Sequence, residues 1–183
     1  MVKKINGKRI SLRALTLRDS KELADKINDK DIAKWTSNIP HPYHEKDALN
    51  YIKECQKKRQ KGEAYQFCII SEDNQLVGGI GIFSVDKDNN NAEIGYWIAK
   101  DYWGKGIATE AVSLILNFGF SELNLHRVYA RVLGENAGSQ KVLEKSGFTF
   151  EGNARESEFK NSKWNDMLNY GILKKEHKKK KSI

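Results

Sequence analysis

The stretch that most constrains the fold runs from Tyr102 to Ala111, where Gly104, Gly106 and Ala108 occupy alternate positions. An apolar run at residues 92–99 precedes it, and apolar residues at helical spacing follow it. A strand, a tight turn of small residues and a helix in this order leave several backbone N–H groups unpaired at the start of the helix. Because the helix dipole favours negative charge there, the turn is a candidate phosphate site. A capped turn without a ligand is the alternative that the local pattern leaves open.

Two other phosphate-binding motifs are absent from the sequence. No segment reads GxxxxGK[ST], and Gly78-Gly79-Ile80-Gly81 neither reads GxGxxG nor opens a helix. We expect these glycines to mark a bulge or a close backbone approach within a strand.

The rest of the chain alternates between strand and helix patterns. Strands are predicted at residues 8–15, 66–70, 76–83, 92–99, 127–132, 148–153 and 164–173. Helices are predicted from Thr16 or Asp19, and at residues 45–61, 106–123 and 136–145. Residues 29–43 contain both prolines and are expected to be irregular. With 183 residues and no internal repeat, the chain is predicted to form one α+β domain over residues 1–175.

The formal charge of +8 is concentrated at one end of the chain. The last ten residues hold six lysines and one glutamate, so the preceding body carries only +3. We expect residues 176–183 to form a basic, frayed and solvated tail. Attraction to RNA or to an acidic surface is the alternative reading of these lysines.

Cysteine, histidine and apolar patterns limit the other functional classes. No apolar run approaches the roughly 18 residues that span a bilayer, and the N-terminus lacks a signal-peptide pattern. Cys55 and Cys68 show no CxxC spacing, which indicates reduced cysteines in a cytoplasmic protein. His41 and His44 have no third ligand nearby, so no metal site is predicted.

Longer motifs accompany the glycine turn. In chain order they read Ile10-Ser11-Leu12-Arg13; Glu93-Ile94-Gly95-Tyr96-Trp97-Ile98; the turn from Tyr102 to Ala111; Leu125-His126-Arg127-Val128; Asn136 with Ser139; Val142-Leu143-Glu144-Lys145-Ser146-Gly147-Phe148; and Phe159-Lys160-Asn161-Ser162-Lys163-Trp164. With these motifs the sequence resembles the GCN5-related N-acetyltransferase (GNAT) superfamily and, within it, the RimJ/RimL-type acetyltransferases. The resemblance covers nearly the whole chain. It departs from the superfamily at Trp103, which stands where Gln or Arg is usual, a substitution common in the RimJ/RimL-type branch.

The resemblance implies a GNAT fold and acetyl-CoA as the acetyl donor, with no metal. The fold would have α/β/α layers, with a mixed, mostly antiparallel sheet that splays between the family's strands 4 and 5 and helices on both faces. The backbone of Trp97, Ile98 and Ala99 would bind the pantetheine arm as an added strand does. The pyrophosphate would lie on the turn, and Asn136 and Ser139 would lie along the arm and near the thioester sulfur. The implied contacts of the turn are Trp103, Gly104, Lys105, Gly106, Ile107, Ala108 and Thr109.

Acetyl transfer to an amine needs a base for the amine and an acid for the departing thiolate. Glu93 is the candidate base, acting through water, and an ion-paired or solvated strand residue is its alternative reading. Ser139 is the candidate acid, whereas Asn136 is equally explained as a helix N-cap. Tyr96 and Trp97 are interpreted as core anchors or as a wall of an acceptor pocket. Neither cysteine has a neighbouring base in sequence, so direct transfer without an acyl-enzyme is expected.

The predicted function is acetyl-CoA-dependent N-acetylation of a primary amine. The acceptor is either a protein N-terminus, of the ribosomal-protein kind, or a small amine such as a polyamine or an antibiotic. A non-catalytic CoA-binding or ribosome-associated module, with the basic tail as its contact, is the alternative from another class. The hypothesis requires neither a membrane nor a nucleic acid, and the family resemblance leaves a homodimer open.

Overall fold

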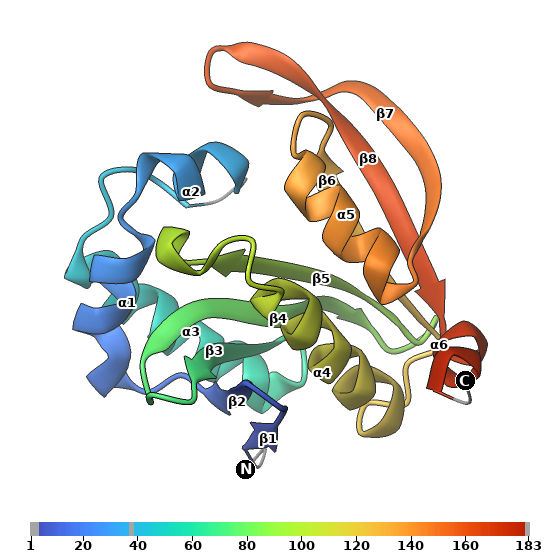
Figure 1. The fold of residues 1–183 in the computed structure, drawn as a ribbon, viewed down its shortest axis with the longest axis horizontal. Coiled ribbons are helices and arrows are strands. Elements are labelled where there is room, and N and C mark those ends of the chain that lie inside the picture. Colours follow the sequence, from blue (N-terminus) through green and yellow to red (C-terminus); the bar gives the residue numbers. More distant parts are fainter. Residues whose placement is uncertain (1–3, 37–38, 182–183) are drawn as a thin grey trace.

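The computed structural model describes residues 4–36 and 39–181, with backbone alone for residues 178–181. Its centre is one sheet in the order β1-β2-β3-β4-β5-β6-β8-β7 (Figure 1). The strands are β1 (Ile5–Asn6), β2 (Ile10–Ala14), β3 (Tyr65–Ser71), β4 (Leu76–Asp86), β5 (Asn91–Ile98), β6 (Arg127–Leu133), β7 (Thr149–Lys160) and β8 (Lys163–Leu173). The α-helices are α1 (Ser20–Ile27), α2 (Lys30–Trp35), α3 (Glu45–Lys61), α4 (Ile107–Ser121), α5 (Ala137–Ser146) and α6 (Lys174–Lys181). Two short 3₁₀ helices are η1 (Leu17–Asp19) and η2 (Lys100–Tyr102).

The sheet splays open between β5 and β6, as the sequence predicted. These strands pair in parallel, and the paired residues are only Asn91–Glu93 with Arg127–Tyr129. β6 then continues beside β8 up to Leu133, while β5 stays beside β4 up to Ile98. The two halves of the sheet therefore diverge beyond Glu93 and Tyr129, and Figure 1 shows β5 and the β7–β8 hairpin running in different directions.

Helices cover both faces of the sheet. α4 and α5 bury their apolar sides in the larger core, through residues such as Val112, Ile115 and Leu143. α1 and α3 enclose a second core on the other face, through residues such as Leu23 and Ile52. Figure 1 shows α4 in front of the sheet and α3 behind it. Burial of these apolar stripes is the main source of stability for such layers. The arrangement confirms the predicted α/β/α fold class.

The clearest helix pattern in the sequence corresponds to a helix in the structure. The helix predicted at residues 45–61 is α3, and Gly62 ends it with φ at +71°. The prediction for residues 29–43 is wrong in part, since α2 forms there once the Asp29 side chain accepts from the N–H of Asp31. α2 has only six residues and buries only Ile32, so it is too short to show a helical period in the sequence.

Two segments at the C-terminal end also differ from prediction. β7 runs to Lys160, whereas the sequence predicted that it would end near residue 153. The prediction stopped short because the outer half of the strand is largely exposed and its sequence has no clear apolar alternation. The backbone is helical as far as Lys181, where a frayed tail was expected. α6 is held at its start, since Lys174 Nζ donates to Asn124 Oδ1 at 2.6 Å and His177 Nε2 lies 2.7 Å from Asn117 Oδ1. The division between a domain at residues 1–175 and a tail at 176–183 stays a prediction.

Candidate active site

The glycine turn connects η2 to α4 and leaves a row of backbone donors free. Trp103 N–H donates to Lys100 O at 3.1 Å, and the first bond of α4 runs from Glu110 N–H to Gly106 O. Gly104 and Gly106 adopt the left-handed region, with φ at +71° and +76°. Among the described residues, the N–H groups of residues 104–109 have no acceptor. The turn therefore presents consecutive donors at the positive end of a helix, which is the chemistry of an anion site.

The two glycines of the turn are needed for different reasons. At Gly104 a Cβ would meet no heavy atom within 4 Å, so only the positive φ excludes larger residues there. At Gly106 a Cβ would lie 3.2 Å from Nη2 of Arg9, so both the conformation and the space beside the turn favour glycine. The open space at Gly104 is consistent with a ligand lying against the backbone.

Trp103 braces the turn instead of presenting a donor to an anion. Its indole N–H donates to the carbonyl of Ile98 at 2.7 Å, and the side chain is 41% exposed. An indole has one donor and no other polar atom, so no side-chain hydrogen bond is left for a phosphate. The departure from Gln or Arg at this position thus ties the turn to the end of β5 and leaves anion binding to the backbone.

The backbone groups of β5 that face the opening are not the full set that the resemblance implied at Trp97, Ile98 and Ala99. Ala99 N–H donates to Val77 O at 2.9 Å, so its donor points to β4. Alternation along an antiparallel pair sends the backbone groups of Trp97 to β4 as well, and those of Tyr96 and Ile98 toward the opening. Since Trp103 occupies the Ile98 carbonyl, the Ile98 N–H and both groups of Tyr96 are the ones that face the opening.

The start of α5 brings two hydroxyl groups together beside this opening. Asn136 is the N-cap of α5, because its Oδ1 accepts from Ser139 N–H at 3.0 Å. The hydroxyl of Ser139 lies 2.8 Å from the hydroxyl of Tyr96 on β5. Burial raises the pKa of Tyr96 to about 12, although its bond to Ser139 acts in the opposite direction. The phenol therefore keeps its proton at neutral pH and can donate to Ser139.

Glu93 lies on the opposite face of β5 from Tyr96. Ala92, Ile94 and Tyr96 pack in the core beneath α4, whereas Trp97 packs against the core beneath α3. Strand alternation then places Glu93 with Trp97. The two candidate catalytic groups, Glu93 and Ser139, thus lie on either side of the opening between β5 and β6.

Glu93 is ion-paired, which was its alternative reading. Its Oε1 accepts from Arg131 Nε on β6 at 2.9 Å, and its side chain is 20% exposed. This hydrogen bond is the main cause that raises the pKa of Arg131. If Glu93 acts as a base, its carboxylate does so while it accepts a hydrogen bond from Arg131.

Two further contacts frame the face of the sheet that carries Glu93. Asp31 in α2 forms an ion pair with Lys100 in η2. At the other end of α2, the carbonyl of Thr36 accepts from Lys160 Nζ at the tip of the β7–β8 hairpin, at 2.6 Å. Figure 1 shows the tip of the β7–β8 hairpin extending over α2 at the top of the view.

The cysteines are unsuited to act as nucleophiles. Cys55 and Cys68 are buried and free, and burial raises the pKa of their thiols to about 11 and about 12. The thiolate is the reactive form, so these values are consistent with the expected absence of an acyl-enzyme. Within the part of the chain that the structure describes, no three His, Cys, Asp or Glu side chains are grouped to hold a metal ion.

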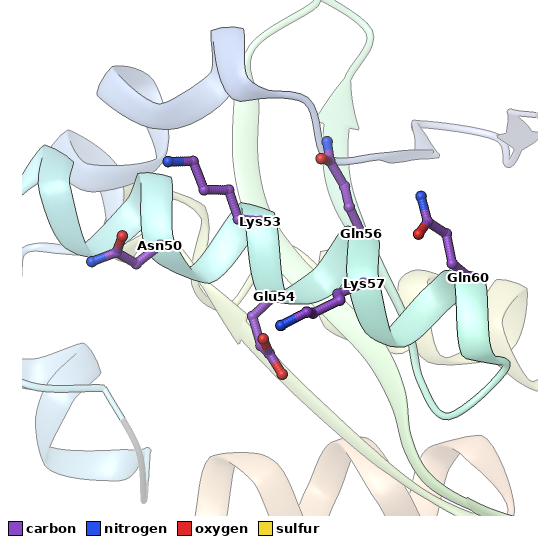
Figure 2. A pocket seen from close by; sticks show the side chains of 6 residues that line it. All are labelled: Asn50, Lys53, Glu54, Gln56, Lys57 and Gln60. Atoms are coloured by element: carbon purple, nitrogen blue, oxygen red, sulfur yellow. The ribbon is translucent and has the colours of Figure 1, made fainter.

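The surface hollows lie away from this arrangement. One is a shallow depression on the outer side of α3, and Figure 2 shows that its six lining side chains, Asn50, Lys53, Glu54, Gln56, Lys57 and Gln60, all extend from that single helix. Another lies beside Arg155, Glu156 and Asp166 on the hairpin. Neither includes Glu93, Asn136, Ser139 or a residue of the glycine turn. Among the described residues, none of the helices combines the length and apolar character needed to cross a membrane.

Comparison with known proteins decides the family. Residues 9–149 match the family model described as "Acetyltransferase (GNAT) domain". The chain belongs to the GNAT acetyltransferase family. "Probable N-acetyltransferase YjcK" of Bacillus subtilis is 37% identical over 92% of this chain and 96% of its own. "Putative ribosomal N-acetyltransferase YdaF" of the same organism is 33% identical over 91% and 92%. "Spermidine N(1)-acetyltransferase" of Vibrio cholerae is 26% identical over 92% and 95%.

Solved structures agree with this GNAT assignment. A crystal structure described as "Probable acetyltransferase" has a TM-score of 0.88 and 30% identity, covering 94% of this chain and 98% of its own. Mycobacterium smegmatis RimJ, solved in complex with CoA-disulfide, has a TM-score of 0.82 and 26% identity, covering 90% and 81%. The GNAT chain is therefore an N-acetyltransferase of the RimJ/RimL type, as the motifs indicated.

Sequence reasoning missed three parts of the site in this GNAT acetyltransferase. Tyr96 was interpreted only as an anchor or a pocket wall, although the alternation of β5 places it on the same face as Ala92 and Ile94. The link from the Trp103 indole to Ile98 has no signal in the sequence. The contact of Arg9 with the glycine turn joins segments about a hundred residues apart, and no local pattern indicates it.

Proposed function

We propose that this acetyltransferase takes acetyl-CoA as its donor and transfers the acetyl group directly to a primary amine. The observation that carries the proposal is the row of free N–H groups at residues 104–109, beside the opening between β5 and β6. Such a row, at the start of α4, fits the pyrophosphate of CoA. The RimJ relative solved with CoA-disulfide supports the same donor.

The opening in the sheet suits the extended arm of CoA. Tyr96 and Ile98 turn backbone groups toward it, in the manner of an edge strand that awaits a partner. The turn and Asn136 would flank this arm at its two ends, with Gly104 leaving open space beside the phosphates. Acetyl-CoA supplies the activated acetyl group as a thioester.

The chemistry divides between the two faces of the sheet. A C–N bond forms as the C–S bond breaks, the amine loses a proton and the sulfur gains one. Glu93 would accept the amine proton through water, with Arg131 holding its carboxylate in place. Ser139 would give its hydroxyl proton to the sulfur, and Tyr96 would orient that hydroxyl and replace the proton. Solvent water would return a proton to the Tyr96 phenolate after CoA leaves, and Glu93 would release the amine proton to solvent.

A protein N-terminus is the acceptor that the charges favour. Two carboxylates near the face with Glu93 are already paired, since Glu93 itself bonds to Arg131 and Asp31 bonds to Lys100. A polyamine needs several unpaired carboxylates for its ammonium groups, whereas a peptide brings one amine and backbone polar groups. The YdaF relative, named as a putative ribosomal acetyltransferase, supports this choice, and the spermidine acetyltransferase relative supports the alternative.

Thiol release from acetyl-CoA, measured with a panel of acceptors, tests the proposal. The panel contains peptides with free N-termini, the same peptides with acetylated N-termini, spermidine and buffer alone. We expect release above background only with the free peptides, and a mass gain of one acetyl group on them. Release with spermidine alone would replace the proposed acceptor by a polyamine. No release with any amine, while calorimetry shows acetyl-CoA binding, would contradict the proposed transfer.

A further inference from the structure

The connection between β1 and β2 lies against the glycine turn. Arg9 Nη1 donates to the carbonyl of Lys105 at 2.7 Å, inside the turn itself. Arg9 Nε donates to Glu110 Oε2 at 3.0 Å, in the first turns of α4. Two nitrogens of the guanidinium thus fix its position beside the row of free N–H groups.

Glu110 organises this connection. Its Oε1 accepts from the N–H groups of Lys8 and Arg9, at 2.7 and 2.9 Å. A Cβ on Gly7 would lie 2.5 Å from the same oxygen, so only glycine fits there without a shift. Burial alone would raise the pKa of Glu110, but the hydrogen bonds from Arg9 and Lys8 lower it overall. The carboxylate is therefore ionised, and both of its oxygens accept hydrogen bonds from this connection.

The pairing also removes an obstacle to anion binding. A free carboxylate near the start of α4 would repel a phosphate held by the same helix end. Arg9 neutralises Glu110, so the pair has no net charge, and it places a permanently protonated guanidinium with N–H donors next to the turn. The backbone N–H groups at the start of α4 consequently stay available to an anion, and the negative charge of Glu110 no longer opposes its binding.

One nitrogen of the Arg9 guanidinium remains free. Its Nη2 has no acceptor among the residues that the structure describes, and it lies 3.2 Å from the position of a Cβ on Gly106. The side chain is 51% exposed, so a ligand can reach it. A guanidinium is planar and permanently charged, so the two N–H donors of Nη2 are held in a fixed direction in which they can bind phosphate oxygens.

We propose that Arg9 is a direct phosphate ligand of the donor site, held in place by Glu110 and the Lys105 carbonyl. The inference rests on the proposed function, since the phosphate belongs to CoA. CoA carries a diphosphate and a ribose phosphate, and both have the chemistry that Arg9 recognises. The residue would set the affinity for CoA without taking part in the transfer.

Calorimetric titration with CoA and with dephospho-CoA tests this contact. Arg9→Gln should weaken CoA binding by about tenfold or more, as expected for a lost hydrogen bond between charged groups. Arg9→Lys should recover part of the affinity. Arg18→Gln removes the same charge from an exposed position in η1 and should leave binding unchanged. A loss confined to CoA assigns Arg9 to the ribose phosphate, and an equal loss for both ligands assigns it to the diphosphate.

Glu110→Gln distinguishes a direct contact between Arg9 and phosphate from a purely structural role of Arg9. If Arg9 contacts the phosphate, Arg9→Gln lowers the salt dependence of CoA binding, whereas Glu110→Gln keeps it. If both variants lose the same affinity and keep the wild-type salt dependence, Arg9 only braces the turn and the inference is overturned. Wild-type affinity in a folded Arg9→Gln variant overturns it as well. A wild-type protein that binds no CoA would overturn the proposed function together with this inference.

Discussion

The hydroxyl of Tyr96 lies 2.8 Å from the hydroxyl of Ser139, although the two residues are 43 positions apart in the sequence. The contact joins β5 to the start of α5 beside the opening in the sheet. Because the buried phenol keeps its proton, Tyr96 can hold the Ser139 hydroxyl in one orientation and supply it with a proton.

The first prediction concerns this pair. Ser139→Ala should lower kcat about a hundredfold, since general acids contribute factors of this order. Tyr96→Phe should lower kcat by a smaller factor and leave the KM for acetyl-CoA nearly unchanged, because it removes only the hydroxyl that positions Ser139. Steady-state thiol release measures both effects. Tyr65→Phe on β3, away from this pair, is the matched control, and it should behave as wild type. A Tyr96→Phe enzyme with wild-type kcat and pH–rate profile would remove Tyr96 from the mechanism.

The second prediction concerns Glu93. Glu93→Gln should lower kcat about a hundredfold and leave CoA affinity intact, because the carboxylate lies on the acceptor side of the sheet. Its pH–rate profile should lose the limb that reports the base. Glu151→Gln serves as a control, since it breaks another ion pair between a carboxylate and a β6 arginine, that with Arg127. An unchanged pH–rate profile in Glu93→Gln would assign the base to another group.

The third prediction concerns Gly106. Gly106→Val should abolish measurable CoA binding, since its Cβ would meet Arg9 and its backbone would leave the left-handed region. Gly62→Val is the control, because Gly62 has a similar φ of +71° at the end of α3. Both variants should lose roughly 1–3 kcal/mol of stability from backbone strain. Only Gly106→Val should lose CoA in a calorimetric titration, and equal binding by both variants would remove the turn from the site.

The fourth prediction concerns stability and pH. Burial alone would raise the pKa of Asp19, but bonds from Arg13 and Thr16 lower it overall. A lowered folded-state pKa gives stability that is present above the unfolded value, about 3.9, and is lost as pH falls through the folded value. Asp19→Asn should therefore cost about 2 kcal/mol at pH 7, and the difference from wild type should shrink toward pH 3. Urea denaturation at both pH values measures it, and a constant difference would contradict the linkage.

Local signals in the sequence predicted the elements but not the contacts between them. The capped start of α5 at Asn136 and the glycines of the turn depend on a few neighbouring residues, so they could be read directly. The face of β5 that carries Glu93 follows from which helices cover each face, and the partner of Glu93 on β6 depends on strand order. Neither is a local property of the chain.

The remaining differences follow from long-range packing. The Trp103 indole contacts the Ile98 carbonyl because η2 brings the turn back beside the end of β5. Arg9 contacts Glu110 because β2 and α4 pack on the same part of the core. α2 escaped prediction because six residues carry too little periodicity. The motifs nevertheless predicted the fold class, because they mark the elements on both sides of the opening.

The proposed donor site requires that the backbone N–H groups of residues 104–109 hold the phosphates of CoA. Amide chemical shifts of ¹⁵N-labelled protein, followed during titration with CoA, test it most directly. The account predicts that the largest shifts occur at residues 104–109, with smaller ones at Ile98 and Ser139, and that the Arg18→Gln protein behaves alike. Saturable binding that leaves the amides of residues 104–109 unmoved, or that shifts instead the outer side of α3, would contradict it.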